Sequence, residues 1–153
     1  MEIMISRIGN HIYAKDAAGA IKFYREAFDL EEQGKPWLDD EGLIIHQDLV
    51  QKNGNLFLGI TDYKHLPDEL FKRKFTADIC PSMLFYVFYL TETELYKSFT
   101  VLSEGATLCR ELEADGKDTI CEIIDKFGAF WHLRLVAQEN QGSWNMTKMF
   151  NIQ

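Results

Sequence analysis

The sequence predicts an α+β protein built from two modules that each run strand, helix and three strands. Segments with strand and helix patterns alternate in the same order in both halves of the 153-residue chain. The expected helix caps Asp16 and Thr91 lie 75 positions apart, and the expected hairpin glycines Gly54 and Gly128 lie 74 apart. Two markers at nearly the same offset indicate an internal structural repeat, although the halves share little sequence.

The first module has a clear helix start and a clear hairpin. Asp16 is a good N-cap, and apolar residues at helical spacing follow it. The Asn53-Gly54 dipeptide between two apolar runs is a strong hairpin signal. The elements expected here are a strand over 4–14, a helix over 17–28, a short strand within 31–38, and strands over 43–51 and 56–61.

The second module repeats this order. Thr91 and Glu94 have the form of a capping box, and Gly105 is placed to end the helix that they begin. The expected elements are a strand over 83–90, a helix with the buried stripe Leu95, Phe99 and Leu102, a short strand over 107–112, a turn-like segment over 113–117, and strands over 119–125 and 130–136 around a turn at 126–129.

The segment between the modules is polar, contains Pro67 and has a short helical stretch near 68–74. We therefore expect a first module over 1–62, a linker over 63–80, a second module over 81–137 and a C-terminal tail over 138–153. The tail is mostly polar. It also contains large apolar residues that suggest docking on another surface, such as a second subunit: Trp144, Met146, Met149 and Phe150.

Composition narrows the classes of partner. The formal net charge of −8 disfavours binding to nucleic acid or to a membrane surface. The chain has no apolar run long enough to span a bilayer and no signal-peptide pattern at Met1. Cys80, Cys109 and Cys121 lack CxxC spacing and are expected to be reduced thiols of a cytoplasmic protein. Motifs of dinucleotide, nucleotide triphosphate and serine-hydrolase sites are absent.

Two segments carry a resemblance to a known superfamily. Residues 13–28, YAKDAAGAIKFYREAF, resemble the first strand-to-helix signature of the vicinal oxygen chelate superfamily, which includes glyoxalase I, bleomycin and fosfomycin resistance proteins and extradiol dioxygenases. Residues 125–131, DKFGAFW, resemble its final hairpin, with Lys126 where proline is usual. Residues 45–49 and 56–58 resemble middle strands of its PhnB-like branch. The resemblance implies tandem βαβββ modules that form a curved mixed sheet around a ligand-sized cleft, with the helices outside.

The resemblance also implies four positions for metal ligands, one on each of four strands. In this chain they fall on Gly9, Gly59, Tyr86 and His132. Glycine offers no donor and tyrosine is an infrequent ligand, so a full metal site is not favoured. The alternative is a displaced site for a divalent metal. That site would use His11, His46 and His132.

Strand alternation predicts which side chains face the cleft. On the last strand Trp131, Leu133 and Leu135 suit the helix side. On the first strand Ile8, Ile12 and Ala14 do so, which leaves His11 and Tyr13 facing the cleft. On the hairpin strand the cleft-facing residues are Phe57, Gly59 and Thr61. The face of His46 stays ambiguous. The side chains expected to bind a ligand are Tyr13, Phe57, Tyr86, Phe88, Phe130, His132 and Arg134.

Several of these residues have two interpretations. Arg134 would receive a carboxylate or phosphate of a ligand, or would pair with an acidic neighbour such as Glu122. The aromatic residues, Trp37 included, would line a pocket for flat or apolar molecules, or would pack in the core. Asp48 or Glu122 would act as a general base if desolvated, or would be an ordinary solvated strand residue.

Three functions follow from these features. The first is a protein that binds a small organic ligand in an aromatic cleft, without a full metal site and without turnover. The second is a metal-dependent lyase or transferase of the glyoxalase type. The third is a dimeric regulatory protein with a vestigial cleft. We expect a homodimer in each case, favour the binder and leave open whether the protein is an enzyme.

Overall fold

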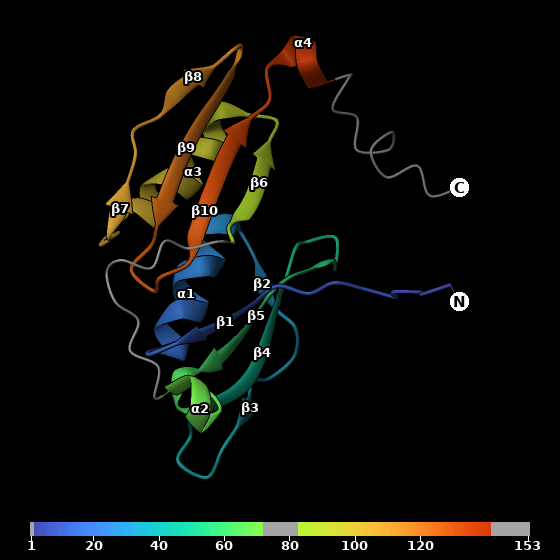
Figure 1. Ribbon diagram of the computed structural model, residues 1–153, viewed down its shortest axis with the longest axis vertical. Helices are drawn as coiled ribbons and strands as arrows, with labels where there is room; N and C mark the ends of the chain where they lie inside the picture. The colour runs from blue at the N-terminus through green and yellow to red at the C-terminus, as the bar shows by residue number, and fades with distance from the viewer. Residues whose placement is uncertain (1, 72–82, 142–153) are drawn as a thin grey trace. The chain divides into compact units, whose positions relative to one another are not determined.

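The computed structural model describes residues 2–71 and 83–141 of the chain. The chain divides into two compact units, Met1–Ile79 and Cys80–Gln153. Each unit has one five-stranded mixed sheet and one long helix (Figure 1). The predicted α+β fold class, with a βαβββ-like order in both halves, is therefore confirmed.

In the first unit the sheet order is β1-β5-β4-β2, and β3 pairs with β4 outside this path. β1 is parallel to β5, whereas the other pairs are antiparallel. The elements are β1 (His11–Ala14), α1 (Ala17–Phe28), β2 (Glu31–Glu32), β3 (Trp37–Leu38), β4 (Ile44–Val50), β5 (Leu56–Asp62), a 3-10 helix (Tyr63–His65) and α2 (Asp68–Phe71).

Helix α1 begins where the sequence predicts. The Asp16 carboxylate accepts a hydrogen bond from the Gly19 backbone N–H at 2.9 Å, which satisfies a free donor of the first turn. A side chain at Gly19 would collide with that carboxylate, so glycine keeps the cap in place. The buried side of α1, which includes Ala20 and Tyr24, packs on β4 and β5.

In the second unit the order is β6-β10-β9-β7, with β8 paired to β9. β6 is parallel to β10, and β9 is antiparallel to β10. The Thr91 hydroxyl accepts from the Glu94 backbone N–H at 3.4 Å, which confirms the predicted helix start. The elements are β6 (Phe85–Tyr89), α3 (Glu92–Ser103), β7 (Leu108–Cys109), β8 (Glu113–Asp115), β9 (Asp118–Ile124), β10 (Phe130–Leu135) and α4 (Gln138–Gln141).

The turn between β9 and β10 is organised by Asp125, which is fully buried. Its Oδ1 atom accepts from the backbone N–H groups of Phe127 at 2.9 Å and Ala129 at 3.1 Å. Its Oδ2 atom accepts from Trp131 Nε1 at 2.7 Å. One carboxylate therefore closes the turn and fixes the indole in the core, as the expected core position of Trp131 requires.

The first strand is shorter than the prediction of 4–14. It begins at His11, and Ile8, which was expected on the helix side, is 84% exposed. The Asn10 side-chain amide donates to the Phe57 carbonyl at 3.3 Å, at the point where the ladder with β5 ends. The apolar pattern of 2–9 thus misled the prediction, because those residues have no strand partner in the described part of the chain.

Other strand predictions also need correction. The turn-like segment 113–117 contains strand β8, which pairs with β9 and turns at Gly116 with φ of 62°. Its exposed, charged residues hid a strand at the edge of the sheet. The expected strands within 31–38 and over 107–112 are reduced to two-residue pieces.

The expected linker and tail are only partly described. The 3-10 helix and α2 lie in the linker, and α2 covers the first part of the helical stretch predicted near 68–74. The remainder of that stretch, Cys80 and the four large apolar residues of the tail lie outside the described residues. No helix in the described ranges is long and apolar enough to cross a membrane.

Candidate functional site

Each unit carries an equivalent row of residues across three adjacent strands of its sheet. In the first unit Gly59 lies between His11 and Asp48. In the second unit His132 lies between Tyr86 and Glu122. Each row thus has one imidazole and one carboxylate, but the histidine lies on the edge strand in one unit and on a central strand in the other.

The row in the first unit corrects one of the four metal-ligand positions that the resemblance implied. Gly9 was expected to hold the first of four ligand positions, but it lies before β1 and outside the row. His11 on β1 pairs with Gly59 on β5, and Tyr86 on β6 pairs with His132 on β10 at the equivalent place. His11 therefore takes the position that Gly9 was expected to hold. The error came from the first strand, because nothing in the apolar pattern marked its start at His11.

Hydrogen bonds fix the ring of His11. Thr61 Oγ1 donates its hydrogen to the Ile45 carbonyl at 2.8 Å, so His11 Nε2 must donate to Thr61 Oγ1 at 2.7 Å. In the neutral ring this leaves the lone pair on His11 Nδ1. Thr61 and His11 share one face of the sheet, as strand alternation predicts.

The structure also places His46, whose face the sequence left ambiguous. Its ring stacks on that of His11, with centroids 5.4 Å apart, and its Nε2 lies 2.9 Å from Asp48 Oδ1. Gly59 makes this arrangement possible, because a Cβ atom there would lie 2.6 Å from His11 Nδ1 and 3.3 Å from Asp48 Oδ1. The absent side chain therefore leaves room for the imidazole.

The surroundings of His11 lower its pKa. Burial lowers the pKa of His11, the nearby His46 ring lowers it further, and the Asp48 carboxylate raises it in part. A neutral imidazole with a lone pair on Nδ1 can accept a proton or a hydrogen bond. The first row is therefore capable of acid–base chemistry.

His132 is the buried histidine of the second unit and is 7% exposed. Its Nδ1 atom lies 3.3 Å from Glu122 Oε1, and its ring stacks on Tyr86 with centroids 4.2 Å apart. Because the carboxylate accepts, Nδ1 of the neutral ring carries the hydrogen and Nε2 carries the lone pair. That buried Nε2 atom has no hydrogen-bond partner within the described ranges.

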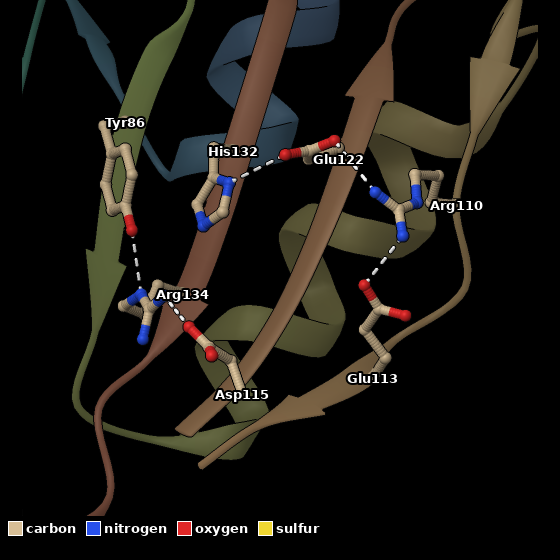
Figure 2. Close-up of polar contacts among 7 residues, drawn as sticks. All are labelled: Tyr86, Arg110, Glu113, Asp115, Glu122, His132 and Arg134. Carbon is tan, nitrogen blue, oxygen red and sulfur yellow. Dashed lines mark hydrogen bonds and ion pairs between the residues drawn. The ribbon is translucent and has the colours of Figure 1, made fainter. Parts of the chain in front are cut away.

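Arg134 is already held by the protein. It donates from Nε to the Tyr86 hydroxyl at 2.8 Å and from Nη2 to Asp115 (Figure 2). Its Nη1 atom donates to Asp118 at 2.7 Å. Burial lowers the pKa of Arg134, but these hydrogen bonds outweigh burial and raise it above its ordinary value. Arg134 therefore pairs with acidic neighbours, as one of its two interpretations predicts, but these neighbours are Asp115 and Asp118 and not Glu122.

Glu122 instead links His132 to a second arginine. Arg110 donates from Nη1 to Glu122 at 3.3 Å and from Nη2 to Glu113 at 2.9 Å (Figure 2). Arg110, Asp115 and Asp118 were not predicted as partners. The available signal was the pair of acidic residues Asp118 and Glu122 on β9, which lie four positions apart and therefore share a face of the sheet.

The predicted aromatic residues divide between surface and packing. Tyr86 and Phe88 are 44% and 39% exposed, and their rings lie 4.6 Å apart. Phe57 instead lies against Phe28 of α1, with centroids 4.8 Å apart. Tyr13 and Trp37 are exposed in the first unit, and Phe130 is half-buried in the second.

The donors do not fit a metal site. Within the described ranges, no group of three or more His, Cys, Asp or Glu side chains is placed to hold a metal ion. On the strand next to His11 the paired residue is Gly59, which has no donor atom. On the strand next to His132 the paired residue is Tyr86, an infrequent metal ligand. The Cys121 thiol is not an evident nucleophile, since burial raises its pKa to about 12.

Solved structures with the same fold identify the architecture, while no family model and no curated protein matches the chain. A PhnB protein from Bacillus cereus is 24% identical, with a TM-score of 0.65 over 86% of this chain and 100% of its own. A glyoxalase/bleomycin resistance protein/dioxygenase family enzyme from Burkholderia phytofirmans is 16% identical, with a TM-score of 0.58 over 82% and 94%.

A third similar structure is the fosfomycin resistance protein FosX from Listeria monocytogenes, in complex with Mn(II) and sulfate. It is 13% identical and has a TM-score of 0.58 over 90% of this chain and 98% of its own. These identities are low, so the likeness concerns the fold. The chain has the tandem βαβββ fold of the vicinal oxygen chelate superfamily, as its sequence signatures predict.

Proposed function

We propose that this protein binds a small organic molecule on the sheet face of the second unit that carries Tyr86, Phe88, His132 and Arg134, which we call the His132 face. The observation that supports this most directly is the buried Nε2 atom of His132, for which residues 2–71 and 83–141 supply no hydrogen-bond partner. A buried acceptor without a hydrogen bond is unfavourable by about 1–3 kcal/mol. We therefore expect a bound ligand to donate a hydrogen bond to this nitrogen.

The surroundings of His132 suit a flat ligand. The exposed rings of Tyr86 and Phe88 offer apolar surface beside the buried nitrogen. Glu122 fixes the orientation of the imidazole, and the Arg134 donor fixes the Tyr86 hydroxyl. A surface that is ordered before binding loses little conformational freedom when a ligand arrives.

The test is a screen of aromatic fragments by protein-observed NMR with matched variants. Tyr86→Ala removes a ring of the His132 face, whereas Tyr96→Ala removes an exposed ring of α3 and serves as the control. We expect fragments to shift signals of the His132 face in the wild type and in Tyr96→Ala, and to bind at least about tenfold more weakly to Tyr86→Ala. Equal binding to both variants would refute the site.

A metal-dependent lyase or transferase of the glyoxalase type is the second candidate. One observation favours it: a histidine that donates from one nitrogen to a carboxylate and presents its other nitrogen is a common arrangement of metal ligands. His11 and His46 would have to join His132. Metal analysis of the purified protein, with thermal shifts against Zn²⁺, Ni²⁺, Mn²⁺ and Fe²⁺, decides between the candidates.

Near-stoichiometric metal that is lost in His132→Phe would make the metal-dependent enzyme the leading candidate. That substitution keeps an aromatic ring against Tyr86 and leaves Glu122 paired with Arg110, so loss of metal would report the missing nitrogen. Absence of metal and of any thermal shift would leave organic ligands as the class to screen.

A further inference from the structure

We infer that the ligand of the His132 face is a planar aromatic molecule that carries a cationic or N–H-donating group, and that anions are disfavoured there. This inference rests on the proposed function, since it names the chemistry of the ligand for the same face. Three features of the second unit support it: the free acceptor nitrogen, the occupied arginines and the excess of carboxylates.

The free atom of the His132 face is an acceptor. His132 donates from Nδ1 to Glu122, so the neutral ring presents a lone pair on Nε2. In Figure 2 this nitrogen points away from Glu122, toward the side on which Arg134 lies. A lone pair is completed by an N–H or O–H donor, whereas a carboxylate or phosphate oxygen would be repelled.

The two arginines near His132 are already paired with carboxylates. Each guanidinium nitrogen of Arg134 already donates to an oxygen, two of them to carboxylates. Both terminal nitrogens of Arg110 donate to carboxylates as well. These carboxylates offset the positive charge that would attract an incoming anion, so the earlier expectation that Arg134 receives a carboxylate or phosphate is not the one we favour.

Carboxylates outnumber the positive charges of this network. Two arginines are set against four acidic residues, so a cation near His132 meets a net negative field. The exposed rings of Tyr86 and Phe88 add attraction for a cation above their faces. The acidic residues that contact the two arginines are Glu113, Asp115, Asp118 and Glu122.

Three probes of nearly the same shape test the inference: benzamidinium, benzamide and benzoate. They differ in charge and in the donors that they present. We expect benzamidinium to bind at least about tenfold more tightly than benzoate, with benzamide between them. Protein-observed NMR titration measures the three affinities and shows whether signals of the His132 face move.

Two variants check the cause of the preference. Asp115→Asn removes a half-exposed carboxylate of the network, and Glu92→Gln removes one on the first turn of α3 as the control. We expect Asp115→Asn to bind benzamidinium more weakly and benzoate more tightly, with Glu92→Gln unchanged. His132→Phe should reduce the affinities for benzamidinium and benzamide because the acceptor is gone.

The outcomes separate this inference from the proposed function. If benzoate binds the His132 face as tightly as benzamidinium or more so, the inference is wrong and the binding function stands. If none of the probes moves signals of the His132 face, and the fragment screen finds no other ligand there, both are wrong. If binding is unchanged in His132→Phe, the free nitrogen does not recognise the ligand and the inference fails.

Discussion

At the scale of single residues, histidines in equivalent rows have different surroundings. Burial and the stacked His46 ring lower the pKa of His11, and its Nδ1 lies over Gly59. His132 is more deeply buried and is held by Glu122. In each row a hydrogen-bond acceptor, Thr61 or Glu122, decides which ring nitrogen carries the hydrogen. The other ring nitrogen is then the one that can accept a hydrogen bond from a ligand.

We expect the ring of His11 to titrate below its ordinary value of about 6.5. Replacing Asp48 by Asn should lower this pKa further, because Asp48 raises it, whereas His46→Ala should raise it. Ring-proton NMR over a pH series measures each value. The folded state binds this proton less readily than the unfolded chain, so His11 reduces stability as the pH falls below about 6.5.

The contrary result for His11 would be a pKa at or above 6.5 in the wild type. That result would mean that the ring is more solvated than its contacts with Thr61 and Gly59 imply. A pKa that does not respond to Asp48→Asn would instead rule out the carboxylate as a cause.

Gly59→Ala is expected to displace the His11 ring, because the added Cβ would lie 2.6 Å from its Nδ1 atom. The hydrogen bond from His11 to Thr61 should be lost, and the His11 pKa should change. Gly9→Ala is the matched control, since its Cβ would meet Leu56 at an ordinary 3.8 Å. Ring signals of His11 that are unchanged in Gly59→Ala would contradict the close approach.

Side chains of the candidate site were predictable only in part. Alternation on β10 puts His132 and Arg134 on the face opposite Trp131 and Leu133, although His132 is buried as they are. The partner of Arg134 was not predictable, because β8 was interpreted as a turn and Asp115 could not be placed beside β9. Long-range pairing of charged edge residues leaves little trace in a single sequence.

At the scale of elements, caps and turns were more predictable than strand lengths. Asp16 and Thr91 start their helices as predicted, because the side chain that caps a helix lies within a few residues of its start. Strand β1 was overestimated, because apolar alternation over 2–9 carries no information about whether a partner strand exists. The length of a strand depends on distant residues.

Asp125→Ala is expected to destabilise the second unit strongly. It leaves the buried donors of Trp131 and Ala129 unsatisfied, at about 1–3 kcal/mol each. Asp125→Asn is the matched control, since its side-chain oxygen still accepts one of these hydrogen bonds, and it should lose less. Urea unfolding measures both, and equal stability of Asp125→Ala and the wild type would contradict the role of the carboxylate.

Asp118 links the start of β9 to the segment after β10. A hydrogen bond from the Ala137 backbone N–H lowers the pKa of Asp118, and Arg134 and Asn140 lower it further. The pKa is thus lower in the folded state, so Asp118 stabilises the fold above its unfolded value of about 3.9 and loses this effect as the pH falls through its folded value. We expect the stability difference between wild type and Asp118→Asn to shrink below about pH 4.

Unfolding curves at neutral and acid pH check this for Asp118. The exposed pair of Arg110 and Glu113 supplies the control, since Glu113→Gln should change stability little at either pH. A stability difference for Asp118→Asn that grows as the pH falls would show that the sign of the pKa shift is wrong.

At the scale of the whole molecule, the homodimer expected from the sequence stays a prediction. One observation gives it a testable form: the segment before β1 exposes four large apolar side chains, an amount that often marks contact with another chain. We expect deletion of 2–8 to weaken self-association, measured by sedimentation equilibrium. An unchanged dimer would assign association to another surface. The exposed residues are Ile3, Met4, Ile5 and Ile8.

The central claim for the whole molecule is that the His132 face recognises a ligand through the Nε2 lone pair. Long-range ¹H–¹⁵N NMR of the His132 ring tests this most directly, because it distinguishes a protonated nitrogen from an unprotonated one. We predict a hydrogen on Nδ1, none on Nε2, and a change at Nε2 when benzamidinium or another aromatic fragment binds. A hydrogen on Nε2, or an Nε2 signal that no fragment alters, would contradict the account.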